Sequence, residues 1–121
     1  MAFAVEAIPD DANLFRRIHR DHLAPQGTIS SQAFNHERLS VNWEKYSDAQ
    51  GTAIESSVAV VALPAGGCRA LGQTVEHTPI EPDQPFGPNR AHAQICGKKD
   101  KTIRHRLRDM ANVVWRRCSE A

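Results

Sequence analysis

The sequence has no long apolar run. The longest, "VAVVAL" at residues 58–63, has the length of a strand, whereas a helix needs about 20 apolar residues to cross a bilayer. The opening "MAFAVEAIPDDAN" has no basic n-region and is interrupted by acids, which is not the pattern of a secretory signal. We therefore expect a protein without a membrane partner.

Cysteine and aromatic residues are also scarce. Cys68, Cys96 and Cys118 are odd in number and widely spaced, which fits neither a disulfide framework nor a CxxC zinc site. Together with the missing signal, this pattern indicates a reducing cytoplasm. Aromatic residues make up 6% of the chain, so aliphatic residues and alanine must fill the core. A chain of 121 residues is most simply one domain, residues 1–121.

Motifs for nucleotides and for activated nucleophiles are missing as well. The glycines of "PAGGCRALG" at residues 64–72 lack the spacing of a P-loop. No serine lies in a GxSxG elbow, and no GxGxxG is followed by a suitable acid. The motifs therefore predict no cofactor, and they favour a non-catalytic protein over an enzyme.

Several segments have the pattern of strands separated by turns. The expected strands, or strand-like pieces, are "GTISSQAF" at 27–34, "RLSVNW" at 38–43, "SSVAVVALPA" at 56–65, "QTVEHTPI" at 73–80 and, as the last strand, "RAHAQICGK" at 90–98. A short helical turn is expected in "GGCRALG" at 66–72. Prolines at every third position from 79 to 88 favour a stiff connecting loop over residues 79–90.

One early segment is ambiguous. "LFRRIH" at residues 14–19 could belong to a helix capped by Asp10 or Asp11, since Leu14, Phe15 and Ile18 have partly helical spacing. It could equally be a first strand, because so short a run does not distinguish the two periods.

The C-terminal segment has the clearest periodicity. Asp100 or Thr102 can cap a helix over residues 100–117. Its apolar stripe consists of Ile103, Leu107, Met110, Ala111 and Val114. The order of elements then predicts an α+β domain, a small and mostly antiparallel sheet with this amphipathic helix packed on it.

Charge is divided unevenly along the chain. Residues 98–117 contain eight Lys or Arg against two Asp, whereas the remainder contains seven against twelve acids. The cations expected to bind an acidic protein partner or the phosphates of a nucleic acid, within a larger assembly, are Lys98, Lys99, Lys101, Arg104 and Arg108. A solvated face whose charges meet acids of the same domain is the alternative. Trp115 is the only aromatic residue of this segment, so stacking on single-stranded bases lacks its usual platforms.

The histidines suggest a second alternative. His19 and His22 are three residues apart, so on a helix both could face one metal ion. His77 and His92 lie on expected strands that could approach them. Three imidazoles with an open position would support metal-assisted hydrolysis.

Several sequence blocks carry a resemblance. "RIHRDHL", "ISSQAF", "LSV" and "AHAQICGKK" resemble blocks shared by a group of small bacterial single-domain proteins without an assigned activity. The resemblance extends over nearly the whole chain. It implies a bacterial, cytoplasmic, single-domain protein, and it transfers no catalytic residue.

A second resemblance concerns the first third of the chain. "LFRRIHRDHL", "GTISSQAF" and "RLSVNW" are similar to the opening of ADP-ribosyltransferase-like toxins. The resemblance implies an NAD-consuming enzyme in which Arg16 or His19 holds the dinucleotide, Ser30 or Ser31 lines the nicotinamide pocket, and Glu76 orients the attacking group.

Overall fold

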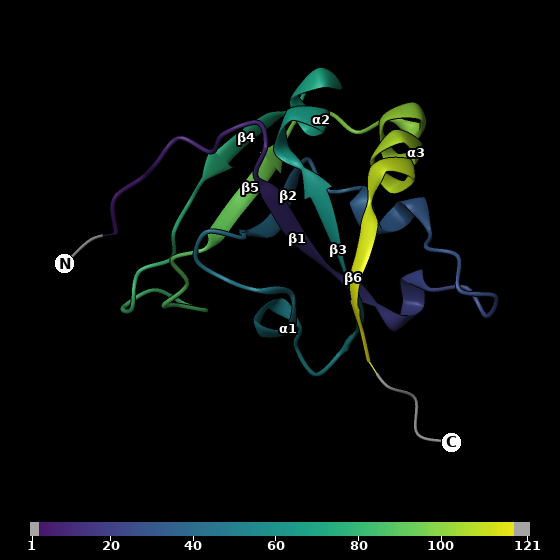
Figure 1. The fold of residues 1–121 in the computed structure, drawn as a ribbon, viewed down its shortest axis with the longest axis horizontal. Helices are drawn as coiled ribbons and strands as arrows, with labels where there is room; N and C mark the ends of the chain where they lie inside the picture. Colours follow the sequence, from purple (N-terminus) through teal and green to yellow (C-terminus); the bar gives the residue numbers. More distant parts are fainter. Residues whose placement is uncertain (1–2, 118–121) are drawn as a thin grey trace.

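Six strands form one antiparallel sheet in the computed structural model, which describes residues 3–117 (Figure 1). The strands are β1 (Asn13–His19), β2 (Arg38–Trp43), β3 (Ser57–Pro64), β4 (Thr74–His77), β5 (His92–Cys96) and β6 (Asn112–Arg116), in the sheet order β4-β5-β2-β1-β3-β6. The helices are α1 (Ala49–Thr52), α2 (Ala65–Ala70) and α3 (Lys101–Met110), with short 3₁₀ helices η1 (Arg20–His22) and η2 (Ser31–Phe34). The expected α+β class and antiparallel sheet are confirmed. None of the helices in residues 3–117 has the length and apolar composition of a membrane span.

The ambiguous "LFRRIH" segment is a strand. β1 pairs with β3 from Asn13 opposite Pro64 to His19 opposite Ser57, and it also begins a pairing with β2 at Leu14 and Phe15. It therefore lies inside the sheet between two partners. The long β-branched run of β3 needs a neighbour on each edge, and β1 supplies one of them.

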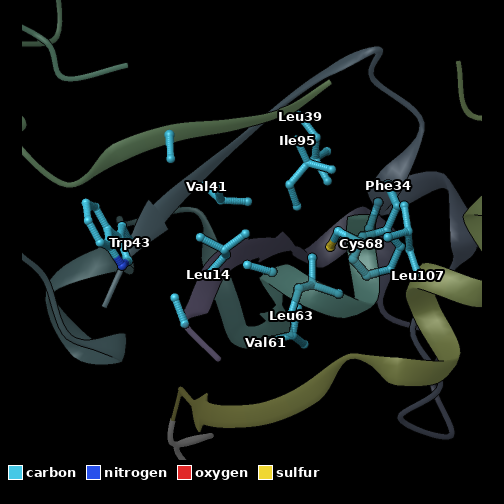
Figure 2. Close-up of a cluster of buried hydrophobic side chains, with 14 of the residues drawn as sticks. Leu14, Phe34, Leu39, Val41, Trp43, Val61, Leu63, Cys68, Ile95 and Leu107 are labelled. Carbon is cyan, nitrogen blue, oxygen red and sulfur yellow. The ribbon is translucent and has the colours of Figure 1, made fainter. Parts of the chain in front are cut away.

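The two faces of the sheet differ in chemistry, because successive side chains of a strand point to opposite sides. The core face carries buried apolar side chains, among them Leu14, Leu39, Val41, Val61, Leu63 and Ile95. Figure 2 shows Phe34, Cys68 and Leu107 close together at one end of this core and Trp43 at the other. The opposite face, called the open face below, presents Phe15 and Arg17 of β1, Ser40 and Asn42 of β2, and His92 of β5. α1 lies against it, because Arg17 Nε donates to the Thr52 carbonyl and Asn42 Nδ2 to the Thr52 hydroxyl.

The expected helix over residues 100–117 was too long, and the strand at 90–98 is not the last one. α3 ends at Met110, Ala111 takes an extended conformation, and the chain continues as β6, which pairs with β3. "VVW" is rich in β-branched and aromatic residues that favour strands, and β3 would otherwise end the sheet. Val114, assigned to the apolar stripe, is 42% exposed on β6.

The expected strand-like piece at residues 27–34 was also wrong. Residues 31–34 form η2, whose Ser30 cap accepts a hydrogen bond from the Gln32 amide. Ala33 and Phe34 are fully buried. A short helical turn buries these two neighbours together, which a strand with alternating side chains does not do.

The segment before β1 is held to the sheet by a polar and aromatic cluster. The Glu6 carboxylate accepts hydrogen bonds from the Tyr46 hydroxyl and from Lys45 Nζ. Its backbone amide donates to His77 Nδ1, and the His77 ring packs against Trp43 and Tyr46. Hydrogen bonds from Lys45 and Tyr46 lower the pKa of Glu6.

Acid is expected to release this segment. The folded pKa of Glu6 lies below its ordinary value of 4.5, so its stabilising contribution is complete above that value and is lost as the pH falls through the lowered folded pKa. Trp43 fluorescence, followed in a Trp115→Phe background, should report a step in this acid range. Glu6→Gln should abolish the step, whereas Glu55→Gln, at an exposed site, should retain it. An unchanged step in Glu6→Gln would contradict the assignment.

Candidate functional site

The cations of α3 form a surface at the start of the helix and along one flank. The Asp100 carboxylate caps the helix by accepting a hydrogen bond from the Ile103 amide. Lys101, Arg104 and Arg108 follow at spacings of three and four residues, which places them on one side over about 10 Å of helix. The basic surface of α3 is defined here as Lys98, Lys101, Arg104 and Arg108. Lys98 and Lys101 are exposed, and both arginines are half-buried.

Acids of the same domain barely neutralise this surface. Among residues 3–117, its one ion pair joins Arg108 Nε to Asp109 Oδ1 at 3.6 Å. The other ion pairs of the described chain lie elsewhere, for example between Arg69 and Asp10. The alternative of a face whose charges are met within the domain therefore accounts poorly for these cations.

Lys99 is not part of the basic surface, which corrects the expectation from sequence. Its side chain is 6% exposed, and Nζ donates to the carbonyl oxygens of Glu37, Ile95 and Gly97 at 3.0, 2.9 and 3.1 Å. Burial lowers the pKa of this ammonium. All three of its protons are used inside the domain, so Lys99 is a structural residue where the chain leaves β5.

Arg104 is partly committed to the same region. Its Nη1 donates to the Lys99 carbonyl at 3.1 Å, and its Nε is buried without a hydrogen-bond partner among the described residues. The remaining Nη2 group is the part of this guanidinium best able to reach a partner.

A hollow lies between α2 and α3, on the other flank of α3. It is lined by Gly67 and Leu71 on the α2 side and by Arg106, Asp109 and Met110 of α3, and its volume is about 360 Å³. Leu71 and Met110 give it an apolar floor at the margin of the core. The solvent-exposed side of α3 lies between this hollow and the basic surface. A partner that covered the helix would therefore contact both.

The residues expected to bind NAD are not brought together. Arg16 donates to the carbonyls of Ala33 and Ser40 at 3.2 and 3.1 Å, and burial lowers its pKa to about 10. Glu76 lies on β4, which β5 and β2 separate from β1, a distance of about 14 Å at ordinary strand spacing. Ser31 lies in η2 and not on a strand, and Ser30 is its cap. Arg16 therefore contacts η2, which contains Ser31, but Glu76 lies on a strand three positions away in the sheet.

The expected metal site is not formed either. The His19 and His22 ring centroids are 6.5 Å apart, but His19 and His22 belong to β1 and η1 and not to one helix face. His92 is held on β5 by Thr78. Within residues 3–117, no three His, Cys, Asp or Glu side chains are placed to hold a metal ion together.

The described thiols do not have the surroundings of catalytic nucleophiles. Burial raises the pKa of Cys68 to about 11, and Cys68 lies inside the apolar core. Burial and the neighbouring Glu76 carboxylate raise the pKa of Cys96. A reactive cysteine needs the opposite shift, since the thiolate is the nucleophile. Cys118 lies outside the described residues.

A cavity on the open face was not anticipated from the sequence. It is lined by Arg17, Ser40, Ile54, Ile80, Phe86, Asn89 and His92, and its volume is about 460 Å³. The alternation of polar and apolar residues in "RLSVNW" and "AHAQIC" could have shown that Ser40 and His92 share a face. The folding of the 79–90 loop over them had no signal in the sequence.

Comparison of the chain with protein-family models, with curated proteins and with solved structures finds no match in any of the three. The functional assignment therefore depends on the surfaces described above.

Proposed function

We propose that this protein is a non-catalytic bacterial interaction module that docks the basic surface of α3 onto an acidic protein partner within a larger assembly. One observation supports this most directly. Lys98, Lys101 and Arg104 have no ion pair within residues 3–117, although the chain outside residues 98–117 is acidic. Complementary charge steers association and selects partners.

An acidic protein fits this region better than a nucleic acid does. The hollow lined by Leu71 and Met110 offers a place for an apolar side chain of the partner, and buried apolar anchors are typical of protein interfaces. A phosphate backbone has no group that needs such a hollow. α3 itself has no Phe, Tyr or Trp on which bases could stack.

The proposal includes the packing of α3 as an amphipathic helix on the sheet. Leu107 is fully buried in the same cluster as Phe34 and Val61. Ile103, Met110 and Ala111 are partly buried against that cluster. Packing of this apolar side would hold the charged flank toward solvent, ready for a partner.

A reducing cytoplasm is the setting that we propose. Cys68 and Cys96, the two cysteines within the described residues, are both free thiols. Structural disulfides are typical of oxidising compartments.

Charge reversal tests the proposed interface. Lys98→Glu, Lys101→Glu and Arg108→Glu, introduced together, replace attraction by repulsion while leaving Lys99 and Arg104 in place. We expect partner capture from a bacterial lysate, quantified by mass spectrometry, to fall about tenfold or more, since like charges facing each other at an interface cost several kcal/mol.

A matched control carries the same change of charge elsewhere. Arg20, Arg38 and Arg116 are exposed and lie outside α3, so Arg20→Glu, Arg38→Glu and Arg116→Glu together should leave capture intact. The captured protein should be acidic. Equal capture by the wild type and the α3 variant, or equal loss in both variants, would contradict the proposed interface.

A further inference from the structure

The open-face cavity has the size and lining of a small-ligand site. Its volume of about 460 Å³ lies within the usual range of about 300–1,000 Å³ for such sites. Arg17, Ser40 and His92 form its polar floor, and the same three residues also line a smaller cavity of about 20 Å³. Ile54, Ile80 and Phe86 contribute apolar walls. Polar groups that converge between apolar walls are typical of sites for organic ligands.

Arg17 brings a positive charge to the floor without an acidic partner. Its Nε donates to the Thr52 carbonyl, which fixes the plane of the guanidinium. Its Nη groups make no hydrogen bond and no ion pair with the described residues. A guanidinium with free Nη donors presents a fork that matches carboxylate, sulfonate or phosphate oxygens.

His92 and Ser40 add hydrogen-bonding groups beside this charge. Thr78 holds the His92 ring, because Nδ1 lies 2.9 Å from the Thr78 carbonyl oxygen and 3.0 Å from the Thr78 hydroxyl. His92 Nε2 lies 3.3 Å from the Ser40 hydroxyl. This contact is longer than an ordinary O–H···N hydrogen bond, so the Ser40 hydroxyl can turn toward a ligand.

The rim of the cavity holds an exposed phenyl ring on a well-defined loop. Phe86 is 95% exposed and has a φ of 67°, the left-handed region that bulky residues rarely adopt. The loop is held by the bridge between Ile80 and Asn89, and a Cβ at Gly87 would lie 1.9 Å from the Glu81 carbonyl oxygen. Residues held in such rarely populated backbone conformations cluster at ligand-binding sites.

We propose that this cavity binds a small aromatic anion, with the acidic group of the ligand on Arg17, Ser40 and His92 and its aromatic body between Ile54, Ile80 and Phe86. The site is separate from the basic surface of α3, because it lies on the open face and α3 packs its apolar residues toward the core face. It would make the protein responsive to a metabolite-sized ligand.

The probe for this site is 8-anilinonaphthalene-1-sulfonate, which combines an aromatic body with a sulfonate. We expect saturable fluorescence enhancement with the wild type. Arg17→Gln should weaken the affinity about tenfold, since it removes a charge-assisted contact. Phe86→Ala should weaken it severalfold while leaving the melting temperature unchanged, because the ring is almost fully exposed.

The α2–α3 hollow supplies the control, since it also pairs an arginine with apolar residues. Arg106→Gln should bind the probe as the wild type does. Backbone amide shifts in NMR spectra should concentrate around Arg17, Phe86 and His92. Unchanged affinity in Phe86→Ala, shifts located at the hollow, or loss of binding in Arg106→Gln would overturn the proposal, even if Arg17→Gln did not fold.

Discussion

Leu107→Ala is expected to lower the free energy of unfolding by about 3 kcal/mol, the usual cost of truncating a fully buried leucine. Leu107 has no exposed surface and lies in the core with Phe34 and Cys68. Its truncation leaves a cavity in this core cluster, which includes Phe34 of η2. For a domain of this size the melting temperature should fall by roughly 10 °C, as measured by calorimetry or circular dichroism.

Val114→Ala is the matched control for this substitution. Both residues belong to the apolar stripe expected from the sequence, but Val114 is 42% exposed on β6. Its truncation should therefore change the free energy of unfolding by no more than about 0.5 kcal/mol, as for most surface sites. Equal losses at the two positions would mean that α3 continues through Val114, and a negligible loss at Leu107 would mean that the helix is not packed.

Lys99→Met is expected to destabilise the fold by a similar amount, about 3 kcal/mol, because it removes a charged donor shared by one buried and two partly buried carbonyl oxygens. Methionine keeps an apolar stem of the same length, with sulfur in place of Cδ, and lacks the ammonium group. The carbonyls of Glu37, Ile95 and Gly97 would then lose a shared charged donor. Urea unfolding should show a lower midpoint with an unchanged slope.

The neighbouring lysine is the control. Lys98 is exposed and its side chain makes no hydrogen bond with the described residues, so Lys98→Met should alter stability by only about 0.5 kcal/mol or less. In binding we expect the opposite difference between the two lysines. Lys98 should contribute to partner capture and Lys99 should not. If the two variants had the same stability, the structural role of Lys99 would be wrong.

Local sequence was sufficient to predict the elements whose structure follows from the pattern of their own residues. β2 and β3 were expected from their apolar and β-branched residues, and the helix cap was expected at Asp100 or Thr102, of which Asp100 is the one observed. The helical turn now seen as α2 was expected from its flanking glycines. These features depend on neighbouring residues only, so no tertiary contact was needed to find them.

The errors arose where a distant partner decides the structure. Residues 112–116 have apolar spacing compatible with a helix, but they form a strand that pairs with the edge of β3. A lysine next to another lysine carries no local sign that three carbonyls from residues 37, 95 and 97 will surround it. Long-range contacts of this kind override local propensity.

The candidate sites also differ in whether local sequence or distant contacts form them. Helical spacing placed Lys101, Arg104 and Arg108 on one side of a helix, and in the structure Lys101 is exposed there and the two arginines are half-buried. The open-face cavity needs β1, β2, β5, the segment after α1 and the 79–90 loop at once. No single stretch of sequence could have indicated it.

Fluorescence anisotropy would measure whether the basic surface of α3 binds an acidic protein in preference to a nucleic acid. A labelled peptide rich in Glu and Leu, a labelled duplex DNA and a labelled RNA would each be titrated with the protein at low and moderate salt. We expect the acidic peptide to bind with an affinity that falls as the salt concentration rises. This binding should be lost in the variant that combines Lys98→Glu, Lys101→Glu and Arg108→Glu. Tighter binding of DNA or RNA than of the peptide would contradict the choice of an acidic protein partner, and equal peptide binding by the variant would contradict the α3 interface itself.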